Sequence, residues 1–227
     1  MAFIEPVKQD PANLARHKRY PAGLRFWHWM NVLIISGSLL TVLINSTLLK
    51  TRGNAAFIQN ESQKNGLVLT QNQARAIAHA QSDEVWSVHI YFGYALAAFF
   101  VFRLILIFSR PKQQRYFTQL KEAYRNYFKR RKNGDNPLHD FAVKVIYLGF
   151  YILLVIMVLT GLSLAFDEKL GIPPNISHSI KDVHGFCMYL VLAFILVHIT
   201  GVVLAERNRS QGIVSDMING GRAKDEL

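Results

Sequence analysis

The sequence predicts an all-α integral membrane protein, a four-helix up-and-down bundle, and three observations support this prediction. Apolar residues are gathered in four blocks, at about 24–44, 85–108, 141–166 and 181–204. Each block is long enough to cross a hydrocarbon core of about 30 Å at about 1.5 Å per residue. The blocks contain almost no acidic residues and lack the polar stripe of a soluble amphipathic helix. Basic residues, finally, are concentrated in alternate connections between the blocks.

This charge sorting predicts the orientation. Eighteen Lys and Arg residues lie before or at the start of the first block, between the second and third, or after the fourth, against five in the other two connections. The positive-inside rule then places both termini and the middle loop in the cytoplasm. A net charge of +11 in a soluble protein would suggest nucleic acid. Here the membrane explains the charge, so we expect lipid contact and no nucleic acid partner.

The segments before the second span differ in character. Residues 1–23 form a basic cytoplasmic arm whose polar start shows no cleavable signal peptide. Span one begins near Trp27 and Trp29, residues typical of a membrane interface. The non-cytoplasmic segment 45–84 is long, and its Thr70-to-Gln73 stretch resembles a capping box. We expect a helix to begin there and to lead through His79 into span two.

The remaining connections lie around spans three and four. An amphipathic cytoplasmic helix is predicted at about 113–131, with aromatic residues on one face and cations on the other. That pattern favours anchoring in the headgroup layer, and a docking face for a cytoplasmic partner is the alternative. A short turn is expected at 167–180. The tail 205–227 ends in a KDEL sequence, which we attribute to chance because the tail is predicted to be cytoplasmic. The one cysteine, Cys187, excludes an internal disulfide.

Four of the eight histidines lie inside the apolar blocks: His28, His89, His184 and His198. Ionisable groups within a membrane span are costly and usually serve a function. His28 and His198 both lie near the cytoplasmic end of their spans, whereas His89 and His184 both lie near the outer end. The four therefore sort into an inner pair and an outer pair.

Span four carries one histidine of each pair, and their spacing suits a stack of two cofactors. Fourteen residues return a helix to within about 40° of its starting direction and rise about 21 Å. His184 and His198 would then point from one helix face at two depths. Two haem b groups, each held by imidazoles from two helices, fit this arrangement. Bis-histidine iron favours electron transfer over oxygen binding.

Small and basic residues near the histidines are further candidates. Gly37 and Gly93 would leave room for the edge of a flat macrocycle, although membrane helices also use glycine for close packing. Arg25 and Arg103 could pair with propionates of the inner haem, and snorkelling to headgroups is the alternative. Lys181 is the corresponding candidate at the outer haem.

Other membrane functions fit the residues less well. A zinc site usually draws its ligands from closely spaced positions and often uses thiolate or carboxylate, but the two histidine pairs are too far apart for one zinc ion. A proton-relay transporter would need Asp or Glu within the spans, and the blocks contain almost none.

The histidine motifs resemble those of the bacterial cytochrome b561 superfamily. The run 24–29 (LRFWHW) is similar to its first-helix motif, and His184-Gly185 with His198 fourteen residues after His184 is similar to its last helix. Residues 212–220 resemble the short cytoplasmic segment that closes many members. The superfamily includes the b-type subunits of nickel–iron hydrogenase, formate dehydrogenase and thiosulfate reductase.

The resemblance implies a dihaem cytochrome of the bacterial inner membrane, with iron ligands at His28, His89, His184 and His198. It implies electron transfer between the quinone pool and a partner redox protein, by a subunit without substrate chemistry of its own. One alternative is a stand-alone oxidoreductase that reacts with quinone and superoxide or oxygen. The other is a haemless anchor or transporter. The resemblance places the quinone near the cytoplasmic rim, around Arg25, Arg103 and Arg207.

Overall fold

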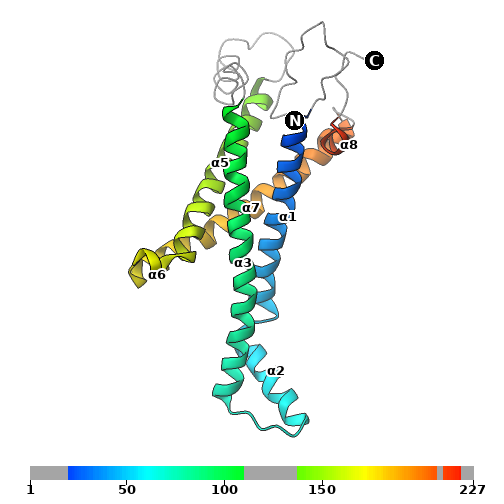
Figure 1. Cartoon of the computed structure of the whole chain (residues 1–227). Helices are drawn as coiled ribbons and strands as arrows, with labels where there is room; N and C mark the ends of the chain where they lie inside the picture. The colour runs from blue at the N-terminus through cyan, green and yellow to red at the C-terminus, as the bar shows by residue number, and fades with distance from the viewer. Residues whose placement is uncertain (1–19, 110–136, 209–211, 221–227) are drawn as a thin grey trace. The chain divides into compact units, whose positions relative to one another are not determined.

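The computed structural model describes residues 20–109, 137–208 and 212–220, and every regular element in these ranges is a helix. The helices are α1 Ala22–Thr47, α2 Thr51–Lys64, α3 Gln71–Phe108, α5 Pro137–Ala165, α6 Asp167–Leu170, α7 Pro174–Asn208 and α8 Ile213–Asn219 (Figure 1). Four of them, α1, α3, α5 and α7, are long and apolar enough to cross a membrane. The predicted all-α membrane fold class is confirmed. The predicted amphipathic helix 113–131 lies outside the described residues.

The four long helices expose their apolar side chains. In the most apolar 18-residue stretch of α3, and in that of α5, only 6% of the residues are buried. Leu33, Ile105 and Leu196 are among many large aliphatic side chains that face outward. A soluble protein would bury such side chains in its core, whereas a bilayer solvates them. The outward apolar surface is therefore the surface expected of a membrane protein.

The described chain divides into two compact units, each considered by itself below. Unit 1 contains Met1–Trp29 and Phe100–Leu227, and unit 2 contains Met30–Phe99. The first turns of α1, the end of α3 and the helices α5 to α8 therefore belong to unit 1. Most of α1, the helix α2 and most of α3 belong to unit 2.

The start of α3 in unit 2 follows the predicted capping box. The backbone N–H of Thr70 donates to Gln73 Oε1 at 2.9 Å, and the N–H of Gln73 donates to Thr70 Oγ1 at 3.3 Å. These reciprocal bonds satisfy two of the backbone donors that a helix start leaves without partners. With 38 residues, α3 is about 57 Å long and extends well beyond a hydrocarbon core of about 30 Å.

The outer segment 45–84 contains a helix that the sequence analysis did not predict. Helix α2 lies beside the extension of α3 (Figure 1). The two helices pack through the buried side chains of Ala55, Ala74 and Ala78. Asn54 Nδ2 also donates to Gln81 Oε1 at 2.8 Å. Because alanine side chains are small, the two helix backbones can approach closely, and a contact of three alanines holds α2 against α3. The polar sequence of α2 shows no apolar stripe, which is why sequence patterning did not reveal it.

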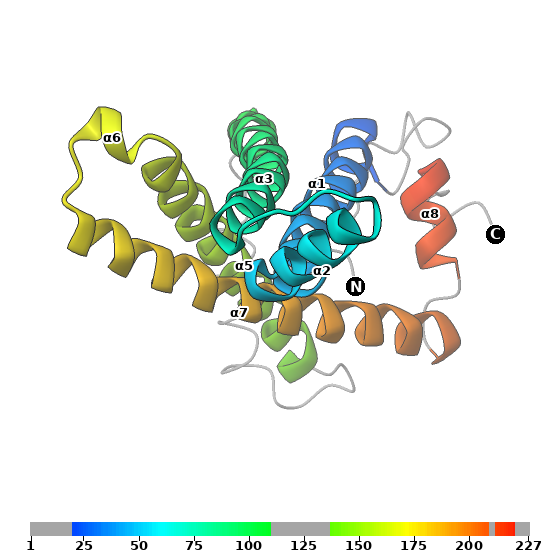
Figure 2. The same cartoon turned by 90° about the horizontal axis from the view of Figure 1, so that it is seen from below.

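In unit 1, α5 and α7 pack along each other and are joined by the short helix α6 (Figure 2). Gly171, at φ 61°, ends α6 in the left-handed conformation that glycine adopts most readily. The expected turn 167–180 is shorter than predicted, because α7 already begins at Pro174. Proline suits the first position of a helix, where no backbone N–H is needed.

Helix α8 lies in the tail 205–227, which the sequence predicts to be cytoplasmic. It is hydrogen-bonded to both α7 and the start of α1. At its N-terminal end, the Glu206 carboxylate of α7 accepts hydrogen bonds from the backbone of Gly212 at 2.7 Å and Val214 at 3.3 Å. At its C-terminal end, Trp29 Nε1 of α1 donates to Met217 O at 3.1 Å, and Arg25 Nη1 donates to the Ile218 carbonyl. A cation at helix C-terminal carbonyls is favourable. Within unit 1, α8 therefore joins the helices of His28 and His198.

Candidate haem sites

The imidazoles of His28 on α1 and His198 on α7 lie together in unit 1. Their ring centroids are 6.3 Å apart and their planes are inclined by 53°. An imidazole nitrogen binds a transition metal at about 2.0 Å, so two rings on one metal ion have centroids about 6 Å apart. The two imidazoles are therefore close enough that they would hold one haem iron between them, and the pair is the inner pair predicted from the sequence.

A polar atom of this pair lacks a partner. His28 Nδ1 is buried and has no hydrogen-bond partner among the described residues. A buried polar atom left in this way costs about 1–3 kcal/mol and calls for an explanation. The described residues thus leave one ring nitrogen of His28 without a partner beside a second imidazole, as a site for a bound group would. The residues present fit a haem at this position.

Aromatic side chains of α5 and α7 hold the ring of His198. Phe194 stacks on it with centroids 5.8 Å apart and planes at 10°, and Phe150 stacks on Phe194 at 4.2 Å. Tyr147 places its hydroxyl 3.2 Å from His198 Nδ1. Packing and a hydrogen bond together restrict the rotation of this imidazole, as a residue that would bind iron requires.

Arg103 on α3 is buried among aromatic rings in unit 1. Its side chain is 6% exposed, its Nε donates to Tyr151 Oη at 2.9 Å, and its guanidinium lies 4.8 Å from the Trp27 ring centroid. No carboxylate among the described residues pairs with it. A buried guanidinium without an anion is a candidate partner for an anionic group of a ligand. Arg103 does not extend outward, so snorkelling does not describe it.

Two further cations lie in the same unit. Arg25 directs its Nη1 to α8, and its Nε is buried without a hydrogen-bond partner among the described residues. Lys144 on α5, one turn before Tyr147, is 7% exposed and was missed by the sequence analysis. A lysine inside the third apolar block was the signal that could have drawn attention to it.

His184 on α7 lies against α5, also in unit 1. Its Nδ1 is 2.8 Å from Thr160 Oγ1, and a Cβ added to Gly161 would lie 3.3 Å from its Cε1. Both contacts come from the third span, which carries no candidate histidine. Because α7 is one continuous helix from Pro174 to Asn208, the rise from His184 to His198 is about 21 Å.

A methyl group at Gly161 should disturb His184. For Gly161→Ala we expect His184 to be displaced, because the new Cβ contacts its ring more tightly than normal packing allows and overpacking costs about 1–3 kcal/mol. Haem content and the temperature at which haem absorbance is lost would measure this. Gly149→Ala on the same helix is the control, since its Cβ meets no described atom within 4 Å. Equal behaviour of the two variants would contradict the expectation.

His89 on α3 has a similar environment in unit 2. Its Nδ1 lies 2.9 Å from Thr41 Oγ1 and 3.3 Å from Ser38 O, both on α1. Trp86 packs at the edge of the imidazole, with centroids 5.3 Å apart. Hydrogen bonds from a neighbouring helix thus orient this ring as well.

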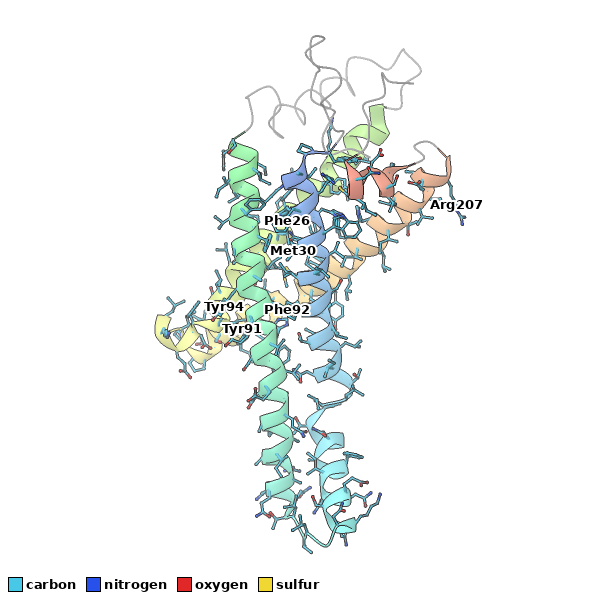
Figure 3. All side chains as sticks on the ribbon, turned by 45° about the vertical axis from the view of Figure 1, so that its right-hand side comes forward. Phe26, Met30, Tyr91, Phe92, Tyr94 and Arg207 are labelled. Atoms are coloured by element: carbon cyan, nitrogen blue, oxygen red, sulfur yellow. The ribbon has the colours of Figure 1, made fainter. Side chains whose placement is uncertain are left out.

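The candidate glycines of unit 2 have different surroundings. A Cβ at Gly37 would clash with the ring of Phe92, which reaches from α3 towards α1 (Figure 3). Gly37 therefore allows close packing of α1 and α3 in this structure. A Cβ at Gly93 meets no described atom within 4 Å. Room beside a macrocycle stays a prediction for both glycines.

The described residues contain no cluster of three or more His, Cys, Asp or Glu side chains able to hold a metal ion. A structural or catalytic zinc site normally needs three or four such ligands. Two imidazoles from different helices, as His28 and His198 provide, are instead a donor set that suits a haem, since the macrocycle supplies the other iron ligands.

Comparison with known proteins identifies the family. The model of the prokaryotic cytochrome b561 family matches residues 19–220. The chain belongs to this family. This cytochrome b561 is thus a multi-pass membrane protein that binds b-type haem and transfers electrons, and the predicted resemblance is confirmed. Membership excludes the haemless alternative.

Two relatives of this cytochrome b561 are named probable Ni/Fe-hydrogenase B-type cytochrome subunits. The protein from Rhizobium leguminosarum bv. viciae is 24% identical over 237 residues, which cover 89% of this chain and 87% of the relative. The protein from Bradyrhizobium diazoefficiens is 25% identical over 233 residues, which cover 89% and 84%. No solved structure matches the chain.

Proposed function

We propose that this cytochrome b561 binds two haem b groups and passes electrons across the membrane between quinone and a partner redox protein. The observation that carries the proposal is the pair His28 and His198, whose rings are 6.3 Å apart. These residues would hold the inner haem, and His89 and His184 the outer one. Haem b supplies a one-electron Fe(III)/Fe(II) couple.

The chain's own residues account for orientation and charge. Tyr147 and Phe194 hold the His198 ring, and the hydroxyls of Thr41 and Thr160 orient His89 and His184. Arg103 and Arg25 would receive the propionates of the inner haem.

The membrane orientation and the partners follow from charge and from the relatives. The excess of Lys and Arg in alternate connections supports cytoplasmic termini in a bacterial inner membrane. The hydrogenase subunit names of two relatives support an oxidoreductase as the partner. Quinone would approach the rim near Arg207, at the C-terminal end of α7 (Figure 3).

Spectroscopy of the purified full-length chain tests the proposal. Reduced-minus-oxidised spectra with extraction of the pigment should give two haem b groups per chain. A quinol analogue should then reduce both groups, and the isolated chain should not turn over superoxide. A single haem per chain would contradict the dihaem assignment, and rapid superoxide turnover would favour the stand-alone oxidoreductase.

A further inference from the structure

The hydrogen bonds of His89 and His184 share a feature that reveals their tautomer. Thr41 Oγ1 lies 2.6 Å from Ser38 O on its own helix, and Thr160 Oγ1 lies 2.6 Å from Ile156 O. Two oxygen atoms at this distance need a hydrogen between them, and a backbone carbonyl carries none. Each threonine therefore donates its one hydroxyl hydrogen to the backbone.

The histidines must then be the donors in their contacts with the threonines. A hydroxyl whose hydrogen is already donated can only accept, so His89 Nδ1 and His184 Nδ1 each carry a hydrogen. The Ser38 carbonyl, 3.3 Å from His89 Nδ1, can also only accept and supports the same tautomer. In a neutral imidazole with Nδ1–H, the lone pair lies on Nε2. Both rings are thereby prepared to bind a metal through Nε2.

We infer that Thr41 and Thr160 are positioning residues that set the tautomer and raise the basicity of the two outer ligands. This rests on the proposed function, which assigns His89 and His184 to one haem. A histidine that donates its second N–H to an acceptor is a stronger donor to its metal. Stronger donation stabilises Fe(III) relative to Fe(II), so the two hydroxyls lower the reduction potential of the outer haem.

The same arrangement arises twice from separate parts of the chain. Thr41 and His89 belong to unit 2, whereas Thr160 and His184 belong to unit 1. At the inner pair no threonine has this role: His28 Nδ1 lacks a partner among the described residues, and His198 Nδ1 faces the phenol of Tyr147. The threonine hydroxyls therefore act on the outer haem and leave the inner one unaffected.

Potentiometric titration of the purified haem-loaded chain tests this inference. Thr41→Val and Thr160→Val keep the side-chain shape and remove the threonine acceptor. In Thr41→Val, His89 Nδ1 retains the carbonyl and the hydroxyl of Ser38, each at 3.3 Å. Thr160→Val should raise the ratio of reduced to oxidised outer haem at a given potential by about tenfold, which is a shift of about 59 mV for one electron. Thr41→Val should raise it by less, because the Ser38 acceptors remain. The low-spin ferric EPR signal of that haem should also shift, because its imidazoles are no longer held in orientation.

The chain offers matched controls. Thr47 donates to Leu43 O at 2.6 Å and Ser163 donates to Leu159 O at 2.8 Å, and neither contacts a histidine. Thr47→Val and Ser163→Ala should leave both potentials unchanged, and Thr41→Ser should restore the parental value. Unchanged potentials in both valine variants, at full haem content, would overturn this inference but not the proposed function. So would a shift confined to the haem that His28→Ala removes. Absence of haem from the parental chain would instead refute the proposed function.

Discussion

His28→Ala and His198→Ala should each remove the same haem and leave the other in place. The centroids of the two imidazoles lie 6.3 Å apart, so both rings would hold the same iron, and they come from different helices. Loss of either one leaves iron with a single protein ligand. We expect about half of the haem b absorbance to be lost in each variant, measured by reduced-minus-oxidised spectra normalised to protein.

Matched variants separate this effect from general damage. His178→Ala is the control, because His178 is an exposed residue of α7 that pairs with Asp182 at 3.2 Å. It should retain both haems. His89→Ala and His184→Ala should remove the other haem, so their remaining spectra should match each other and differ from those of the inner variants. A pattern of losses that crosses these pairs, in variants that remain helical by circular dichroism, would refute the pairing.

Arg103→Met should lower the reduction potential of the inner haem. A buried positive charge favours the reduced iron, which carries one positive charge fewer, and methionine keeps much of the side-chain volume without the charge. At a given potential, the ratio of reduced to oxidised inner haem should fall by more than tenfold, which corresponds to a drop in reduction potential of more than about 59 mV. Redox titration of the inner haem measures it.

Two further variants define the cause of this shift. Arg103→Lys keeps the charge but loses the planar fork of the guanidinium. Its potential should stay nearer to the parental value than that of Arg103→Met. Arg75→Met removes an exposed arginine from the same helix and should change neither haem. If Arg103→Met and Arg75→Met behave alike, Arg103 has no electrostatic role at the haem.

Much of the fold could be predicted because the bilayer imposes a strong constraint on sequence. Every span must satisfy its backbone internally and present apolar side chains to lipid, so long apolar blocks predict helices. The start of α3 was predictable for a local reason, since Thr70 and Gln73 cap the helix within four residues. Helix α2 was not, because its contact through Ala55 depends on α3 rather than on its own sequence pattern.

Some features of the candidate site could likewise be predicted from the sequence, and others could not. His28 and His198 could be paired by depth because rise along a helix is constant. Arg103 could be noticed as an ionisable group near a span end, but its burial between Trp27 and Tyr151 could not be foreseen. The burial of Lys144 could not be foreseen either, because a lysine near the end of a span usually extends its amine to the headgroups.

The sequence by itself determined that the chain crosses a membrane on four helices and at which depth each histidine lies, because these properties depend only on composition and position along a helix. The tertiary structure alone decided which side chains orient the histidines. Thr41 reaches His89 from α1 and Thr160 reaches His184 from α5, and such contacts depend on how each helix is rotated about its axis. Helix rotation follows from packing against neighbours, which no single segment encodes.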